Sequence, residues 1–463
     1  MIFNSQEFLI FFSVVVSFFF IIPHKLRRHF ILAASYFFYA WWNPLYIFLI
    51  IISTLTDFIA GKKIDKTEQK KIRKTWLTLS LIVNIGILFT FKYVNFIAET
   101  FNLTQDGGKL LNVLLPVGIS FYTFQTISYT IDINRKKIKP ENNLINFSLY
   151  VAYFPQLVAG PIERAGNIIP QFKQKVKFDA ERVSKSLILI TLGFFQKVVI
   201  ADNLAIFVDT VYNNPESYHG LSIAIATIFF AFQIYNDFAG YTNIARGTAL
   251  IMGIKLSINF RQPYFASSLH DFWKRWHISL STWFKDYVYI SLGGKKLPLP
   301  KWALAILITF TISGFWHGAN WTFIAWGFLN ALVYILETLF RKAKNDKKTS
   351  NKIYKTSRII FTFILINFLW IFFRANSFSD AVLIIGNLAT FDFSIPFDTK
   401  WLIVCFLLIL ANILIDFIDS KNEISNWLYT KPLFFRGIII YFLLMSIFFI
   451  GNWHLSPFIY FQF

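Results

Sequence analysis

Residues 302–340 read WALAILITFTISGFWHGANWTFIAWGFLNALVYILETLF, which is two apolar runs on either side of the polar group 316–321. Roughly fifteen apolar residues precede Trp316, and a helix of that length rises about 22 Å at about 1.5 Å per residue. Loops rich in basic residues flank the segment, so both of its ends are predicted to lie on one side of a membrane. We therefore predict a segment that enters the bilayer and returns, with His317 near its far end.

The composition of the whole chain supports a membrane protein. Its 463 residues are 56% hydrophobic, and the mean hydropathy of +0.52 exceeds that of ordinary soluble domains. Further apolar runs, each near the roughly 20 residues of a spanning helix, occupy residues 8–22, 45–60, 76–91, 187–207 and 434–450. No small-residue cleavage pattern follows the first run, so we expect a retained helix. The predicted fold is an all-α polytopic membrane protein, one domain over residues 1–463, with about eleven transmembrane helices plus re-entrant and interfacial segments.

The formal charge of +20 at pH 7 lies mainly in short loops between apolar runs. This distribution follows the positive-inside rule, so the lipid bilayer is the expected partner and nucleic acid is not. Loops rich in Lys and Arg are predicted to be cytoplasmic: 24–28, 62–74, 135–139, 173–185 and 341–358. Loops nearly free of basic charge are predicted to be extracytoplasmic: 95–108, 212–220 and 376–398. Alternation through these loops puts both termini on the extracytoplasmic side of the membrane.

Several kinds of chemistry find no support in the sequence. Cys405 is the chain's one cysteine and lies in an apolar run, so neither an intramolecular disulfide nor a cysteine metal cluster is expected. The zinc motif HExxH, the nucleophile motif GxSxG and Gly-rich phosphate loops do not occur. We expect no metal site and no bound cofactor.

His317 is the strongest candidate for a catalytic residue. Ionisable side chains within membrane segments usually face a bundle interior or a water-filled cavity and mark a functional path. A neutral imidazole can take a proton from a hydroxyl and pass it to a leaving group, as transfer from a thioester to an alcohol requires. The alternative is a His that packs between helices and bonds to a backbone carbonyl. Gly314 and Gly318 permit close backbone approach in either case.

His277 is the second candidate, within a stretch of basic, aromatic and apolar residues (260–296) that predicts amphipathic helices at the membrane interface. His270 lies seven residues earlier, so on one helix the two imidazoles would project from nearly the same face. Two His without a carboxylate or thiolate at ligand spacing do not predict a zinc site. We interpret His270 as part of an interfacial belt, whereas the pattern leaves the role of His277 open.

Further polar residues are candidates for lining a substrate passage. They are Trp316, Asn320, Asp237, Tyr241, Asp132 and Gln156. Polar groups within a membrane need hydrogen-bond partners. Each of these residues could therefore line a passage or could only tie helices together, and both interpretations stay open.

Six stretches of the chain resemble the membrane-bound O-acyltransferase family, in particular its bacterial alginate and peptidoglycan O-acetyltransferases. They read LPVGISFYTFQ (115–125), FPQLVAGPI (154–162), NFRQPY (259–264), FWKRWHISLS (272–281), DYVYI (286–290) and WHGANW (316–321). The resemblance implies a ring of helices around a central funnel, in which a narrow passage joins an inner donor site to an outer acceptor site. It also implies that His317 is catalytic and that His277 is the second essential residue. Asn243 and the pair Asn330-Ala331 depart from the family pattern, where Asp and His-Gly are common, which bears on substrate details.

The C-terminal residues FIYFQF (458–463) resemble a C-terminal signature of bacterial systems that acylate surface polymers. In those systems the tyrosine is proposed to carry the acyl group, and that position is Tyr460 here. A phenol with a pKa near about 10 is a poor nucleophile until a base removes its proton, which His317 could do. The alternative, and the simpler one without the resemblance, is an aromatic anchor at the membrane interface.

The predicted function is O-acetylation of an extracytoplasmic polysaccharide or peptidoglycan, with cytoplasmic acetyl-CoA as the acyl donor. The resemblance implies a separate periplasmic acetyltransferase of the serine hydrolase type as the partner, since such systems usually need one and this chain has no serine nucleophile motif. Two alternatives stay open. One is a transporter or flippase without acyl chemistry, and the other is a family member that acylates a lipid or a protein.

Overall fold

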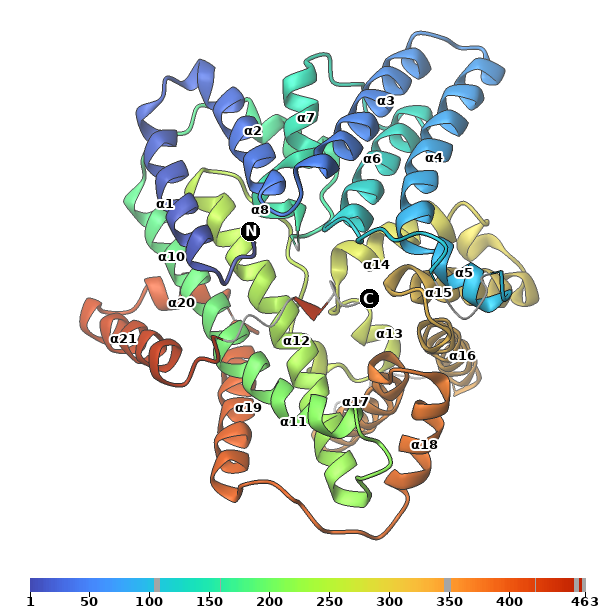
Figure 1. Cartoon of the computed structure of the whole chain (residues 1–463), viewed down its shortest axis with the longest axis vertical. Coiled ribbons are helices and arrows are strands. Elements are labelled where there is room, and N and C mark those ends of the chain that lie inside the picture. The colour runs from blue at the N-terminus through green and yellow to red at the C-terminus, as the bar shows by residue number, and fades with distance from the viewer. Residues whose placement is uncertain (104–108, 159, 345–350, 421, 454–457, 460–463) are drawn as a thin grey trace. The chain divides into compact units, whose positions relative to one another are not determined.

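The computed structural model is all-helical over the residues it describes, which are 1–463 except 104–108, 159, 345–350, 421, 454–457 and 460–463 (Figure 1). The helices of the first part are α1 (Gln6–Ile21), α2 (His24–Ala40), η1 (Pro44–Tyr46), α3 (Ile47–Asp65), α4 (Lys70–Lys92), α5 (Val94–Thr100), α6 (Ile119–Asn134), α7 (Leu144–Ala152), α8 (Phe154–Leu157), α9 (Ala165–Phe172) and α10 (Ala180–Phe194). Those that follow are η3 (Phe195–Ala201), α11 (Asp202–Tyr212), α12 (Gly220–Ile251), η4 (Pro263–Phe265), α13 (Leu269–Phe272), α14 (Ile278–Phe284), η5 (Lys285–Tyr289), η6 (Gly294–Lys296), α15 (Leu299–His317), α16 (Trp321–Lys344), α17 (Lys352–Arg374), α18 (Phe378–Leu388), α19 (Thr399–Asp419), α20 (Ile424–Tyr429) and α21 (Leu433–Phe449).

Eight helical stretches within the described ranges are long and apolar enough to cross a membrane. They are Pro44–Asp65, Lys70–Lys92, Ala180–Tyr212, Gly220–Ile251, Leu299–His317, Trp321–Arg341, Lys352–Arg374 and Thr399–Asp419. Three shorter apolar helices accompany them: α1, α18 and α21. The prediction of an all-α polytopic membrane protein is thereby confirmed.

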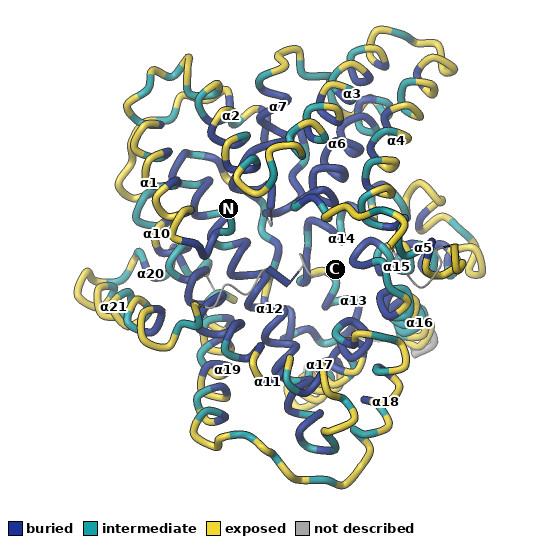
Figure 2. Tube along the Cα trace, in the orientation of Figure 1, coloured by how far each residue is buried: buried dark blue, intermediate teal, exposed yellow. Residues whose placement is uncertain are grey.

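The outer surfaces of these helices are apolar. Figure 2 shows α21 as largely exposed, and its large side chains Phe434, Phe448 and Phe449 are 81%, 72% and 75% exposed. Exposed apolar area on this scale is unfavourable in water but is accommodated among lipid tails. The burial pattern therefore agrees with helices that face a bilayer.

Contacts divide the chain into two compact units. Unit 1 consists of Met1–Ile190 and Tyr241–Ser257, and unit 2 consists of Thr191–Gly240 and Ile258–Phe463. In unit 1, α3, α4 and α6 pack against one another. In unit 2, α15 packs against α16, and α16 packs against α17.

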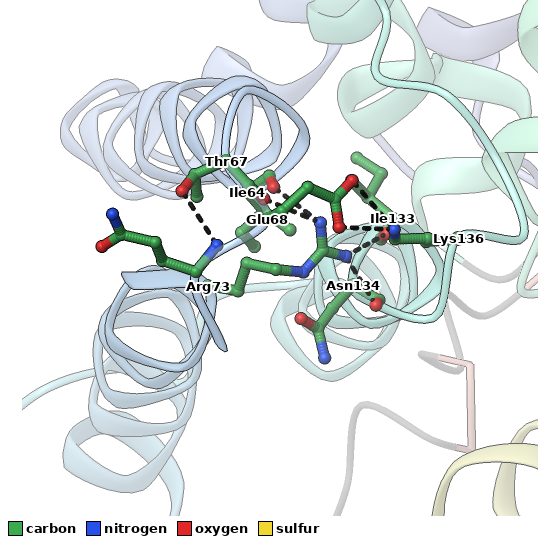
Figure 3. A network of polar contacts seen from close by, with 8 residues as sticks. Ile64, Thr67, Glu68, Arg73, Ile133, Asn134 and Lys136 are labelled. Atoms are coloured by element: carbon green, nitrogen blue, oxygen red, sulfur yellow. Dashed lines mark hydrogen bonds and ion pairs between the residues drawn. The ribbon is translucent and has the colours of Figure 1, made fainter. Parts of the chain in front are cut away.

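Arg73, in the first turn of α4, fastens the ends of three helices in unit 1 (Figure 3). Its guanidinium donates to the carbonyls of Ile64 (2.9 Å) and Thr67 (3.3 Å), and to those of Ile133 (3.2 Å) and Asn134 (2.7 Å). The last carbonyls of a helix have no partner within the helix, and a cation there also interacts favourably with the helix dipole. One buried arginine therefore caps the C-terminal ends of α3 and α6 together.

The basic loops of unit 1 contact one another. Three side-chain contacts join them: Lys136 with Glu68 (2.7 Å), Lys173 with Glu141 (2.6 Å), and Arg27 with the Val176 carbonyl (2.6 Å). A common side is what the charge-based topology requires of these loops.

The loops of unit 2 that are poor in basic residues also contact one another. Leu221 donates its N–H to the Asp392 carbonyl (2.8 Å), and the Asn387 amide donates to the Pro215 carbonyl (2.9 Å). The chain segments 212–220 and 376–398 therefore meet, as their predicted placement on one side requires.

Polar pairs hold α19 against earlier residues of unit 2. Three hydrogen bonds make this contact: Asn412 to Asn236 (2.9 Å), Tyr235 to Asp416 (2.7 Å) and Gln262 to Asp419 (2.7 Å). Each buried polar group finds a partner, as polar groups away from water must.

Candidate active site

His317 is the last residue of α15, where the chain turns back into α16. The turn is tight because glycines stand where a side chain would collide. A Cβ atom on Gly318 would lie 2.2 Å from the Phe323 ring, and one on Gly314 would lie 2.2 Å from the Phe323 carbonyl oxygen. The predicted apolar descent and return are therefore present as a helical hairpin, with His317 at its closed end.

Aromatic rings surround the His317 imidazole, which is 4% exposed. The ring centroids of Trp316, Trp326 and Phe373 lie 4.8, 5.2 and 5.2 Å from that of His317, with interplanar angles of 72°, 88° and 72°. Edge-to-face contacts of this kind are favourable and restrict the orientation of the central ring. The imidazole is thus held in one orientation within a largely apolar shell.

His277 has an uncommon backbone conformation. Its φ is +39°, in the left-handed region that a residue with a Cβ adopts at a cost of about 1–2 kcal/mol. Hydrogen bonds on both sides impose this conformation: Ile278 N–H donates to the Asn259 carbonyl (2.9 Å), and Arg261 N–H donates to the Arg275 carbonyl (3.0 Å). Strain of this kind is typical of functional sites, where it fixes the direction of a side chain.

The His277 imidazole is fully buried and lies outside the eight candidate spans. Burial lowers its pKa from 6.5 to about 3, because the charged form loses its hydration. The ring is therefore neutral at physiological pH, a weak base that offers one hydrogen-bond donor and one acceptor.

The expectation that His270 and His277 share one helix face is wrong. The helix that begins at Leu269 ends at Phe272, and His277 is the N-cap residue just before a separate helix, α14. His270 is half-buried, and its Nδ1 lies 2.5 Å from the Tyr334 hydroxyl of α16. The sequence pattern misled here because long-range backbone pairing interrupts the helix.

The Trp316 ring lies close to the imidazoles of both histidines. Its ring centroid lies 6.3 Å from that of His277 and 4.8 Å from that of His317. His277 therefore lies beside Trp316, at the His317 end of α15.

Asp237 of α12 belongs to a buried ion network. Its carboxylate lies 2.7 Å from Lys197 Nζ, which also lies 2.8 Å from Asp202, and the three side chains are 1–5% exposed. The other carboxylate oxygen of Asp237 accepts the N–H of Ile459 (2.7 Å). Asp237 is thus tied to a lysine and to the C-terminal segment.

The sequence reasoning missed Lys197 and Asp202. The signal was present, because charged residues are rare within an apolar run such as 187–207 and mark functional or paired positions. What the sequence could not provide is the pairing of these residues with Asp237, which depends on how η3 packs against α12.

The C-terminal segment reaches the neighbourhood of His277 through two aromatic contacts. The ring centroid of Phe458 lies 5.3 Å from that of Phe238, and the Phe238 centroid lies 4.5 Å from that of His277. Phe458 and Ile459 are both buried. Tyr460, the candidate acyl carrier, lies outside the described residues.

The other candidates for the passage fall into both units. In unit 2, Asn320 accepts the Thr322 N–H (2.9 Å) and donates to the Asn376 carbonyl (3.1 Å), and Trp316 has been described above. The remaining three are bonded within unit 1: Tyr241 to Asn4 (3.0 Å), Gln156 to the Tyr150 carbonyl (2.8 Å) and Asp132 to Lys137 (3.8 Å). The structure therefore groups Trp316, Asn320 and Asp237 in the unit that contains both histidines.

No three His, Cys, Asp or Glu side chains gather at metal-binding distances in the part of the chain that the structure describes. The groups available for chemistry at this site are therefore imidazoles, a carboxylate and a lysine. Imidazoles are suited to moving a proton between an attacking hydroxyl and a leaving group.

Comparisons with known proteins agree on one family. The family model described as MBOAT, membrane-bound O-acyltransferase family, matches residues 65–378, a range that includes both histidines, Lys197 and Asp237. A peptidoglycan O-acetyltransferase of Helicobacter pylori is 34% identical over 374 residues, which cover 75% of this chain and 71% of that protein. A probable alginate O-acetylase, AlgI, of Pseudomonas putida is 36% identical over 359 residues, which cover 76% and 72%. A teichoic acid D-alanyltransferase of Streptococcus thermophilus is 29% identical over 269 residues, which cover 55% and 62%.

Proposed function

The chain belongs to the membrane-bound O-acyltransferase family, and from this premise we propose that it moves an acetyl group from cytoplasmic acetyl-CoA to a carbohydrate acceptor across the membrane. It is an O-acyltransferase and a multi-pass membrane protein. Acetyl is the proposed group because relatives at 34% and 36% identity are named as O-acetylating enzymes. The observation that carries the proposal is the pair of buried imidazoles, His277 and His317, which both lie close to the Trp316 ring.

We assign the base of the reaction to His317. A nitrogen of its imidazole takes the proton of the attacking hydroxyl, whose oxygen then forms a bond to the thioester carbonyl carbon. The carbon–sulfur bond breaks, and the departing thiolate receives the proton from the imidazolium. His277, held by its strained backbone and neutral because of burial, orients a reacting group through a hydrogen bond beside the same indole.

The donor is proposed to enter from the cytoplasm of a bacterial inner membrane. The basic loops of unit 1 contact one another, which supports a common cytoplasmic side, and their Lys and Arg residues would attract the phosphates of acetyl-CoA. Both termini then lie outside. The same reasoning gives the direction of transfer, from an inner donor toward an outer acceptor.

The first acceptor is proposed to be the hydroxyl of Tyr460. A separate periplasmic acetyltransferase of the serine hydrolase type would then attack the tyrosyl ester with its serine oxygen, and the phenol would regain its proton as the ester bond breaks. The final acceptor is a hydroxyl of alginate, peptidoglycan or a similar glycan. A supporting observation is that Ile459, one residue before Tyr460, is buried and bonded to Asp237.

Inside-out membrane vesicles that receive radiolabelled acetyl-CoA test this proposal. The wild-type chain should become labelled, whereas His317→Ala should lose at least about 100-fold in labelling, a typical effect of removing a general base. Tyr460→Phe should lose the label because the phenolic oxygen is gone. His270→Gln is the matched control, because His270 lies beside Tyr334 and away from the two histidines, and it should label as the wild type does.

The outcomes separate the alternatives. Labelling that is indifferent to His317→Ala would refute the catalytic assignment and favour a transporter without acyl chemistry. Labelling that needs a long-chain acyl-CoA would favour acylation of a lipid or protein. Labelling that is lost in His317→Ala but remains in Tyr460→Phe would support the acyltransferase activity and refute the tyrosine relay.

A further inference from the structure

The buried ion network of Lys197, Asp202 and Asp237 has no role in the proton transfer described above. Burying charged groups is expensive, and side chains of this kind within membrane helices are kept where they have a function. All three side chains are at most 5% exposed, so water does not compensate their charges. The network calls for a function of its own.

The helix packing around the network is specific. Lys197 lies in η3, a π-helical segment within the span Ala180–Tyr212, and π-helical segments are frequent at functional sites. Gly240, three residues after Asp237, lets α12 approach this segment. A Cβ atom there would lie 2.7 Å from the Gly193 carbonyl oxygen and 3.0 Å from Lys197 N. A glycine is therefore required for the lysine to reach Asp237.

The network has one cation and two carboxylates, so it can accept a further hydrogen-bond donor. That donor is the backbone N–H of Ile459, 2.7 Å from Asp237 Oδ2. Hydrogen bonds to an ionised acceptor are shorter and stronger than neutral ones. Because the donor is a backbone group, the bond fixes the position of the tail whatever side chain stands at position 459.

Hydrogen bonds also hold the residues just after α21 against η3 and α11. Asn452 donates its N–H to the Val198 carbonyl (2.8 Å) and its side-chain amide to the Asp202 carbonyl (3.3 Å). The Asn203 amide donates to the Ile450 carbonyl (2.9 Å). The chain therefore contacts η3 and α11 just after α21, and meets the network again at Ile459.

We propose that Lys197, Asp202 and Asp237 form a docking site for the chain's own C-terminal tail, and that Asp237 positions this tail for acylation. Phe458 is fully buried against Phe238, which also contacts His277, so the docked tail lies close to that imidazole. Asp237 is a positioning residue in this proposal, and Lys197 holds its carboxylate in place. The inference rests on the proposed tyrosine relay for its purpose, but the docking itself does not require acyl chemistry.

A cysteine-protection experiment on the full-length protein in detergent tests the docking. Ile459→Cys keeps the backbone N–H and Phe458, and its thiol should react slowly with a water-soluble maleimide. Adding Asp237→Ala should raise that rate at least about 10-fold, equivalent to about 1.4 kcal/mol of lost docking, because a hydrogen bond to a charged group disappears. The native Cys405 is fully buried and serves as an internal control, since its protection reports that the fold is intact.

The matched control is Asp416→Asn, a buried carboxylate of the same unit that bonds to Tyr235 and not to the tail. It should leave the Ile459→Cys thiol protected. If Asp237→Ala also exposes Cys405, the protein has unfolded, and Asp237→Asn replaces it because it keeps the shape of the side chain and loses the charge. A thiol at 459 that stays protected in both Asp237 variants while Cys405 is buried would overturn the proposal.

A kinetic measurement separates positioning from a general loss of structure. Asp237→Asn should lower kcat for tail acetylation while KM for acetyl-CoA stays within about 2-fold, because the donor site is unchanged. A raised KM with unchanged kcat would overturn the positioning role. Docking without any acetyl on the tail would uphold the docking and refute both the relay and the positioning role, so the two failures are distinguishable.

Discussion

Replacing His277 by Asn should make the fold less sensitive to acid. The imidazole is fully buried, and burial lowers its pKa from 6.5 to about 3. The unfolded chain therefore binds a proton below about pH 6.5, whereas the folded chain does not do so until about pH 3. The folded state therefore has its full stability with respect to His277 above about pH 6.5, and it loses stability as the pH falls below that value. At pH 5, about 1.5 units below the pKa of the unfolded chain, the free energy of unfolding is lower by about 2 kcal/mol, because each unit contributes about 1.36 kcal/mol.

Asn is the replacement of choice because it tolerates the left-handed backbone that His277 adopts and does not titrate. Thermal unfolding followed by the fluorescence of the 14 Trp, at pH 7.5 and 5.0 in detergent, measures the effect. The wild-type melting temperature should fall more between the two pH values than that of His277→Asn, while His270→Gln should follow the wild type more closely. Equal falls in the wild type and His277→Asn would refute the conclusion that burial keeps this ring neutral.

Three further substitutions test the packing. Arg73→Ala should destabilise the protein by about 3 kcal/mol, measured by chemical unfolding, because four backbone carbonyls lose a buried cationic donor. Gly318→Ala should lower acetyl transfer about 10- to 100-fold, since the new Cβ collides with Phe323 and displaces the adjacent His317. Gly386→Ala is the control and should leave activity unchanged, because no atom lies within 4 Å of the added Cβ. Gly240→Ala should expose the Ile459→Cys thiol to maleimide as Asp237→Ala does, because α12 can no longer approach Lys197. A thiol that stays protected would contradict the proposed docking.

The helices and the hairpin around His317 could be predicted because they rest on local properties. Apolar runs of spanning length became α3, α4 and the helix from Ala180 to Tyr212, and the polar group at 316–321 became the turn between α15 and α16. Length and hydropathy determine such elements in a membrane, where every backbone group must be satisfied within the helix.

The conformation at His277 could not be predicted, because it depends on a backbone pairing with Asn259 eighteen residues earlier. Local sequence around His270 and His277 is compatible with one helix, and only the tertiary contact ends it. The pairing of Asp237 with Lys197 could not be predicted for a similar reason. Its lysine lies forty residues earlier, and their meeting depends on a glycine contact and on the helical phase of η3.

The helical phase of η3 has a consequence for insertions and deletions. Lys197 and Asp202 are five residues apart, and on an uninterrupted α-helix, at about 100° per residue, their side chains would point about 140° away from each other. In the π-helical segment the Asp202 N–H bonds to the Lys197 carbonyl, five residues back, which brings both side chains to the same side, where they pair at 2.8 Å. Deleting one apolar residue between them would preserve a spanning helix of almost the same length and hydropathy. It would also place the two residues four apart, about 40° from each other on an ordinary α-helix, so they would still pair without the wide turn, whereas one inserted residue would turn them about 120° apart.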